Sequence, residues 1–298
     1  MGVLVSVIVP TYRREDELFN ALSSLATQTY PNIEIVLVDD NGNFEWNEKV
    51  RVVVEKIKEK YPSVMMQCIV NSPNRGSAQT RNIGIESSKG EYITFLDDDD
   101  LYLPHKIENQ ILFMQKNLLD YSVTDLHLYD ENEHLVDKRN RTYIEEISKD
   151  KLFEYHMKYH ITGTDTMMFR REYLLDIGCF PMIDVGDEFY LMQRAIEHDG
   201  KFGYLKECEI KAYIHTGSMG LSSGYGKIQG ENRLYRHKQK YFNQLNKTTV
   251  RYIKSRHHAV LAYAYLRMKR VFSFLMEAGL SFLSSPTSCV KILLNRMR

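Results

Sequence analysis

The chain has 298 residues and no formal net charge, with 39 Lys and Arg against 39 Asp and Glu. This length is sufficient for a large core in one or two domains. The balanced charge argues against a nucleic acid as partner. Four widely separated cysteines without a Cys-x-x-Cys pair argue against a disulfide framework or a zinc site. The apolar start, MGVLVSVIVP, lacks the basic region of a signal peptide, and we therefore expect a cytoplasmic protein.

The first hundred residues alternate short β-branched runs with amphipathic helical stretches. Strands are predicted at Val3–Val9, Ile33–Val38, Val64–Val70 and Tyr92–Leu96, and helices at Asp16–Gln28, Trp46–Lys60 and Ser77–Ser87. Nearly continuous apolar strands that alternate with helices indicate an α/β protein with a parallel sheet covered on both faces. The sequence contains neither GxGxxG nor GxxxxGK[ST], so dinucleotide-binding and P-loop folds lose their main support.

The second half follows a looser pattern. A hairpin is predicted from Tyr121–Tyr129 and Leu135–Val136, a strand at Asp165–Phe169 and further strands within Lys201–His215. Predicted helices cover Tyr143–Tyr159, Arg171–Ile177, Glu188–His198, Ile228–Asn246 and Thr248–Met276, and a Gly/Ser-rich loop covers Thr216–Gly226. We expect a domain over residues 1–247, divided near residue 110, and a helical C-terminal extension over 248–298.

Four consecutive carboxylates, Asp97 to Asp100, directly follow a predicted strand. Adjacent negative charges at the end of a buried strand repel one another, and a hard cation such as Mg²⁺ or Mn²⁺ would neutralise them. In open α/β sheets, ligands bind beyond the carboxyl ends of the strands. An ordinary strand-to-helix turn is the alternative, because Pro104 is typical of a helix start.

Polar residues follow the second and third predicted strands as well. Asp39 and Asp40 follow the second strand and could accept hydrogen bonds from a base or a ribose, although Asx-Gly sequences also form simple turns. After the third strand, Gly76 could let the backbone approach a ligand. Arg81, one helical turn later, could offer a phosphate a bidentate contact or form a surface salt bridge.

Two segments in the second half are candidates for chemistry. Asp187 and Glu188 open a predicted helix, where acids either complement the helix dipole or act as a catalytic base. His215 ends a predicted strand before the Gly/Ser loop and could bind a metal or a phosphate.

Several of these segments occur together in one order. They are Val5–Tyr12, Gln28-Thr29-Tyr30 with Val38-Asp39-Asp40, Asn74–Asn82, and Phe95–Asp100 with Pro104. In this combination the chain resembles the family 2 glycosyltransferases of the GT-A fold, strongly over residues 3–110 and more weakly to about 246. The resemblance implies a Rossmann-like, mostly parallel sheet and an inverting, metal-dependent hexosyl or N-acetylhexosaminyl transfer from a nucleotide sugar, most simply a UDP-sugar.

The resemblance also implies roles for individual residues. Donor-binding positions are Pro10, Thr11, Tyr12, Asp39, Asp40, Asn74, Arg75, Gly76, Arg81, Asp97 and Asp98. Asp97 and Asp99 match the DxD motif, with Asp99 as ligand of Mn²⁺ or Mg²⁺, His215 as a second ligand and Asp100 as an acidic companion. Glu188 falls where the family has its base, and Asp187 remains an alternative because the usual Glu-Asp order is inverted here.

Residues 248–298 contain nine Lys and Arg against one acid, Glu277, which gives this segment a net charge of +8. A basic helical segment suits the anionic inner face of a cell membrane, and a dimerisation arm is the alternative. We therefore expect a peripheral enzyme that extends a cell-surface glycan or a lipid-linked saccharide. A nucleotidyltransferase that makes a nucleotide sugar and an inactive glycan-binding homologue are the two other hypotheses.

Overall fold

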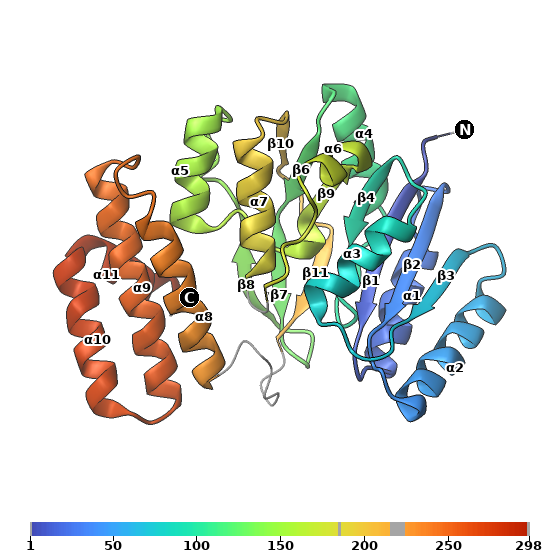
Figure 1. Cartoon of the computed structure of the whole chain (residues 1–298), viewed down its shortest axis with the longest axis horizontal. Helices are drawn as coiled ribbons and strands as arrows, with labels where there is room; N and C mark the ends of the chain where they lie inside the picture. The colour runs from blue at the N-terminus through green and yellow to red at the C-terminus, as the bar shows by residue number, and fades with distance from the viewer. Residues whose placement is uncertain (1, 184–185, 215–223, 297–298) are drawn as a thin grey trace. The chain divides into compact units, whose positions relative to one another are not determined.

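The computed structural model describes residues 2–183, 186–214 and 224–296. The chain forms two compact units, the first with residues 1–152 and 161–215 and the second with residues 153–160 and 216–298 (Figure 1). Helix α5 (Lys149–Tyr159) crosses from the first unit into the second. Across the described ranges, no helix combines the length and the hydropathy needed to cross a bilayer.

The first unit is built on a mixed sheet of seven described strands. In spatial order these are β10 (Phe202–Leu205), β6 (Tyr121–Thr124), β9 (Met167–Arg170), β4 (Tyr92–Phe95), β1 (Val5–Thr11), β2 (Ile33–Asp39) and β3 (Met65–Val70). Only β9 runs against its neighbours, while β4, β1, β2 and β3 are parallel. The predicted mostly parallel sheet is confirmed.

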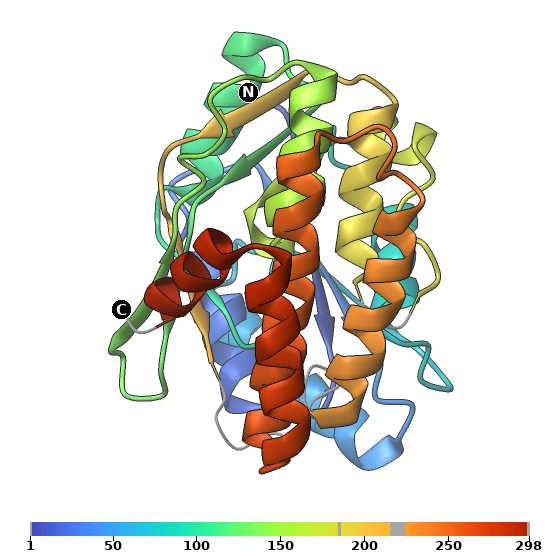
Figure 2. The ribbon, with the colours of Figure 1, turned by 90° about the vertical axis from the view of Figure 1, so that its left-hand side faces the viewer.

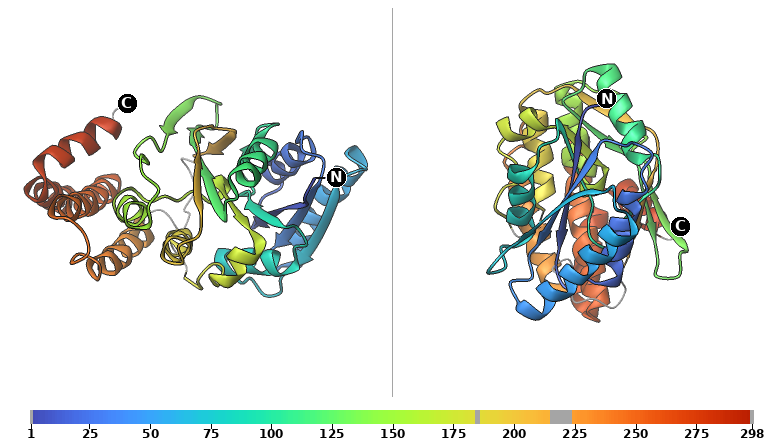
Figure 3. Two further views of the ribbon diagram at one scale, coloured as in Figure 1. Left: turned by 90° about the horizontal axis from the view of Figure 1, so that it is seen from above. Right: turned by 90° about the vertical axis from the view of Figure 1, so that its right-hand side faces the viewer.

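Helices cover both faces of this sheet, because successive strand residues point to opposite sides. Val5, Val7 and Val9 share a core with α1 (Asp16–Ala26), α2 (Phe44–Lys60) and α4 (Lys106–Asn117). On the opposite face, Ile8 faces Gly84 of α3 (Ser77–Ser87), where a Cβ atom would lie 2.4 Å from Ile8 Cγ2. Figure 3 shows the helices on the two sides of the sheet.

A second sheet pairs β5 (Leu101–Tyr102), β11 (Ile210–Tyr213), β7 (Leu126–Tyr129) and β8 (Leu135–Arg139) in that order. The predicted strand Tyr121–Tyr129 is therefore wrong as one element, since it divides into β6 and β7 in different sheets. Asp125 lies at the break, and its Oδ1 accepts hydrogen bonds from Arg141 N at 2.9 Å and Tyr204 Oη at 2.6 Å. These bonds hold the chain where it changes sheet.

The second unit is helical, with α8 (Gly224–Gln239), α9 (Lys247–Arg267), α10 (Val271–Ser284) and α11 (Pro286–Arg296). The predicted single helix Thr248–Met276 is wrong, because the chain turns at Lys269, whose φ is +58°, and α10 returns along α9 (Figure 2). Helix α8 was assigned to the first domain, but it packs on α9 within the second unit. The predicted boundary after residue 247 stays a prediction.

Gly84 allows α3 to pack closely on β1, and this contact generates a stability prediction. Gly84→Ala should lower the free energy of unfolding by about 1–3 kcal/mol, the usual cost of overpacking a core. Urea unfolding followed by the fluorescence of Trp46, the one tryptophan of the chain, measures it.

Gly279→Ala in α10 is the matched control, because its Cβ would meet no atom within 4 Å and alanine favours a helix over glycine. An unchanged unfolding midpoint in Gly84→Ala would contradict the predicted close contact.

Candidate functional site

The carboxyl ends of β1, β2 and β4 meet at one edge of the sheet. Parallel registers pair Thr11 with Asp39 and Ile8 with Phe95, so the acids after β2 and β4 follow strands that flank β1. Because β9 is antiparallel, its beginning lies beside the end of β4, with Met168 opposite Thr94. The edge therefore collects polar residues from four separate segments.

Asp39 and Asp40 have different roles in this structure. Asp40 accepts bonds from the backbone N–H groups of Arg75 at 2.7 Å and Gly76 at 2.9 Å, and its carbonyl accepts from Asn74 Nδ2 at 2.7 Å. It therefore holds the loop that leads into α3, where Gly76 has a φ of +80°.

Asp39 is fully buried. Its Oδ1 accepts bonds from Asn41 N at 3.0 Å and Asn41 Nδ2 at 2.7 Å. Its Oδ2 is buried and has no hydrogen-bond partner within the described ranges. Burial raises the pKa of Asp39, against the hydrogen bonds from Asn41. An unsatisfied buried acceptor is costly, so Oδ2 is suited to a donor from outside the chain.

Asp98 connects the acidic run to the end of β1. Its Oδ2 accepts bonds from Thr11 Oγ1 at 2.7 Å and Tyr12 N at 3.1 Å. Burial and the neighbouring Asp99 raise the pKa of Asp98 to about 7. Asp99 Oδ2 lies 2.7 Å from Arg14 Nη2 in a salt bridge.

Arg81 is buried between two carboxylates. Its Nη2 donates to Asp97 Oδ1 at 2.6 Å and its Nη1 to Asp187 Oδ2 at 3.3 Å. Burial acts to lower the pKa of Arg81, but Asp97 and Asp187 outweigh it and the pKa is raised. Its guanidinium therefore binds carboxylates in this structure, in a buried form of the salt bridge that the sequence offered as one alternative. The contact with a phosphate stays a prediction.

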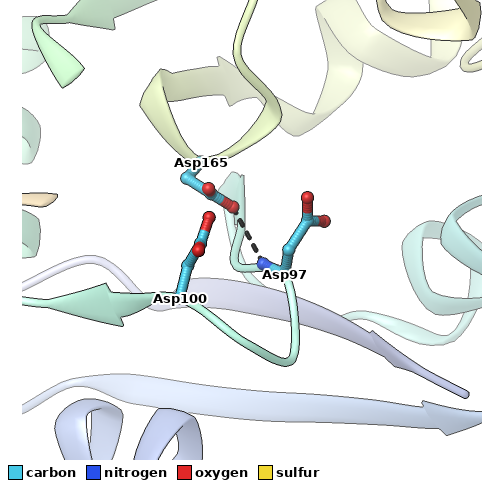
Figure 4. A group of neighbouring side chains, drawn as sticks. All are labelled: Asp97, Asp100 and Asp165. Atoms are coloured by element: carbon cyan, nitrogen blue, oxygen red, sulfur yellow. Dashed lines mark hydrogen bonds between the residues drawn. The ribbon is translucent and has the colours of Figure 1, made fainter. Parts of the chain in front are cut away.

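Asp97, Asp100 and Asp165 form a cluster in which one oxygen of each lies within 4.8 Å of the others. Asp97 and Asp100 lie on the loop after β4, and Asp165 lies in the turn before β9 (Figure 4). Asp97 N donates to Asp165 Oδ1 at 2.8 Å. Burial and Asp97 raise the pKa of Asp165 to about 7, and burial and Asp165 raise that of Asp100. This set of oxygen donors fits a hard divalent cation.

A buried polar network lies beneath the cluster. Lys106 Nζ donates to Thr94 Oγ1 at 2.7 Å and to Tyr102 Oη at 2.6 Å, and Tyr102 Oη donates to Asp165 O at 2.8 Å. Burial lowers the pKa of Lys106 well below its usual range, against the opposing effect of Asp165. The network therefore fixes the position of Asp165 mainly through hydrogen bonds.

Asp187 and Glu188 open α7 (Asp187–Glu197), which follows Gly186 at a φ of +83°. Glu188 Oε2 accepts bonds from Gly163 N and Thr164 Oγ1, both at 3.1 Å. Burial and Asp187 raise the pKa of Glu188. Burial also raises the pKa of Asp187, while Arg81 acts to lower it.

The predicted site residues are therefore mostly gathered at this edge. Pro10, Thr11 and Tyr12 lie at the end of β1, and Asn74, Arg75 and Gly76 lie in the loop that Asp40 holds. His215 lies outside the described residues. Asp165, Tyr102 and Lys106 were missed as site residues. The one available signal was an acid two residues before the apolar run Met167–Phe169.

Comparisons with known proteins agree with this geometry. A family model described as glycosyl transferase family 2 matches residues 6–178. An uncharacterized glycosyltransferase from Haemophilus influenzae is 39% identical over 114 residues, covering 38% of this chain and 35% of the relative. WfaP of Escherichia coli, named a UDP-Glc:alpha-D-GlcNAc-diphosphoundecaprenol beta-1,3-glucosyltransferase, is 35% identical over 126 residues, 42% of this chain and 47% of WfaP. The match thus spans less than half the length of either relative.

Two solved structures share the fold. TarS 1–349 of S. aureus in complex with UDP-GlcNAc has a TM-score of 0.61 at 17% identity and covers 94% of this chain and 91% of its own. The mannosyltransferase PcManGT of Pyrobaculum calidifontis with GDP-Man and Mn²⁺ has a TM-score of 0.60 at 16% identity, covering 100% and 88%. The predicted GT-A fold is confirmed. Since the family model matches more than half of the chain, the protein is a glycosyltransferase of family 2.

Proposed function

We propose that this enzyme is an inverting, metal-dependent glycosyltransferase that uses a UDP-sugar and extends a lipid-linked saccharide or a cell-surface glycan. The observation that carries the choice of donor is the buried Oδ2 of Asp39, which has no hydrogen-bond partner among the described residues. Uracil has an N3–H group that would donate to this oxygen. Thr11, which pairs with Asp39 across the sheet, and Tyr12 would border the same base.

The acidic edge supports a metal-bound diphosphate. Asp99 is the predicted ligand, and Asp97, Asp100 and Asp165 offer further carboxylate oxygens. A divalent cation bound there would offset the charge that develops on the departing diphosphate. Arg14 pairs with Asp99. Because such a partly exposed ion pair stabilises the fold only slightly, a divalent cation could replace Arg14 as the partner of Asp99 at little cost. His215 stays a predicted second ligand.

Glu188 is the base in this proposal. The acceptor oxygen attacks the anomeric carbon, the bond from that carbon to the diphosphate oxygen breaks, and the nucleoside diphosphate leaves with the electron pair. Glu188 takes the proton of the acceptor hydroxyl. Its raised pKa makes it a stronger base than an ordinary glutamate, whereas Asp187 forms a salt bridge with Arg81.

The acceptor class rests on the name of WfaP, which describes a glucosyltransferase acting on a diphosphoundecaprenol-linked sugar. A related acceptor for this chain would bring it to the inner face of the cell membrane. The basic segment 248–298 supports that location.

Asp39→Asn tests the proposal that the nucleobase of the donor is uracil. The variant places an amide N–H where Oδ2 would accept from uracil, so UDP affinity should fall by about 5- to 150-fold, the usual range for one unpaired buried hydrogen bond. Cytosine has an acceptor at N3, so CDP should lose less affinity or gain some. Calorimetric titration with UDP and CDP measures both ratios, and equal losses for the two nucleotides would contradict the assignment.

Glu188→Gln should keep the affinity for UDP and lose transfer by at least about 100-fold, the usual share of a general base. The wild-type rate should fall on the acidic side as the carboxylate is protonated, at a pH above the ordinary glutamate value because the pKa is raised. The variant should lose this limb of the profile. Asp187→Asn is the matched comparison, and if it alone abolishes transfer, the base is Asp187.

Asp99→Asn should weaken binding of Mn²⁺ in the presence of UDP by at least about tenfold, because a carboxylate ligand is lost. Electron paramagnetic resonance of free Mn²⁺ measures it without turnover. The exposed Asp137→Asn serves as control. If Asp165→Asn loses Mn²⁺ binding while Asp99→Asn retains it, the metal site is the cluster of Asp97, Asp100 and Asp165. If the wild type does not bind Mn²⁺, the proposed metal dependence is wrong.

A further inference from the structure

Helix α10 exposes apolar residues and buries polar ones, the reverse of an ordinary surface helix. Its eight exposed residues are all apolar or glycine: Val271, Phe272, Leu275, Met276, Gly279, Leu280, Phe282 and Leu283. Phe272 is 83% exposed and Leu283 is 79% exposed. Helices of water-soluble domains normally show the reverse pattern, and large contiguous apolar patches on such domains mark binding surfaces.

Two polar residues of α10, Glu277 and Ser281, face inward. Glu277 is buried and pairs with His258 Nδ1 at 2.7 Å. Ser281 is buried and donates to Ser255 O on α9 at 2.8 Å. Because hydrogen bonds to α9 set the rotation of α10, its apolar side is directed outward by its own packing.

The surroundings of this apolar face are basic. Glu277 is the one acid among residues 248–298, and it is buried. Basic residues with exposed side chains lie on the neighbouring helices α9 and α11 and in the turn between α9 and α10: Arg251, Lys254, Arg267, Lys269, Arg270 and Lys291. An apolar strip with basic neighbours and no exposed acid matches the interface of an anionic lipid bilayer.

We propose that the exposed face of α10 inserts into the headgroup region of an anionic membrane and holds the enzyme there. A second copy of the chain is the weaker occupant, because a symmetric contact through this face would bring two segments of charge +8 together. With 14 residues and a rise of about 1.5 Å per residue, α10 is too short to cross a bilayer and lies along its surface.

Binding to vesicles tests this. The full chain should co-sediment with phosphatidylcholine vesicles that contain about 30% phosphatidylglycerol and much less with pure phosphatidylcholine, and rising salt should weaken binding. The double variant Phe272→Glu/Leu283→Glu should lose at least about tenfold in partitioning. Arg267→Gln/Lys291→Gln should lose about 5- to 30-fold, following the usual contribution of each basic residue near the surface.

Controls match each change. Phe44→Glu alters a phenylalanine that is 81% exposed on α2, and Lys58→Gln/Lys116→Gln removes two exposed charges from the first unit. Both controls should bind vesicles as the wild type does. Circular dichroism checks that the variants remain folded, which is expected because the replaced side chains are exposed.

Three results would overturn the proposal. The first is that the wild type does not bind anionic vesicles. The second is that both double variants, Phe272→Glu/Leu283→Glu and Arg267→Gln/Lys291→Gln, bind as the wild type does. The third is a stable dimer in lipid-free sedimentation that Phe272→Glu/Leu283→Glu abolishes. The last result would assign the face to a second copy of the chain. None of these measurements depends on sugar transfer, so failure here leaves the proposed reaction untouched.

Discussion

The site depends on one buried guanidinium. Arg81 lies between Asp97 at the end of β4 and Asp187 at the start of α7, two positions that are 90 residues apart in the chain. Buried charges are tolerated only when they are paired. The pairing therefore constrains the acidic run and the base-bearing helix to one edge of the sheet, and the close packing of α3 at Gly84 keeps Arg81 in reach of both.

Around this ion pair the edge carries an excess of carboxylates. Asp98, Asp100 and Asp165 all have raised pKa values, each because burial disfavours the charged form and neighbouring acids repel it. An arrangement of this kind is poorly neutralised by the chain itself and favours an external cation. Arg81 and Arg14 offset part of this charge. Tyr102, which accepts a hydrogen bond from Lys106, donates to the backbone carbonyl of Asp165 and so holds that residue in place.

The two units differ in the chemical character of the surface that each would use for binding. In the first unit, charges converge on one sheet edge, which is a usual place for a small ligand. In the second unit, α10 buries Glu277 and Ser281 against α9 and leaves its apolar side exposed. The predicted single helix over residues 248–276 did not reveal this apolar face. The chain reverses at Lys269, which separates the basic helix α9 from the apolar helix α10.

Periodicity and residue type were sufficient for the parallel core. Apolar runs, helical spacing and acids after strand ends are local properties, and the sheet, its covering helices and the acidic edge were predicted from them. The ordered motifs also sufficed for the family. Asp165 could not be found in this way, because it enters the site only through the antiparallel course of β9, and strand direction is set by long-range pairing.

Local patterns and their order were therefore enough to predict the parallel strands, the acidic edge and the family. Only the tertiary structure separated Asp39 from Asp40, because the two differ in hydrogen-bond partners that come from the distant loop 71–76. It alone also brought Asp165 to Asp97 and turned the apolar face of α10 outward. Each of these depends on contacts between segments far apart in the chain, and no local pattern encodes them.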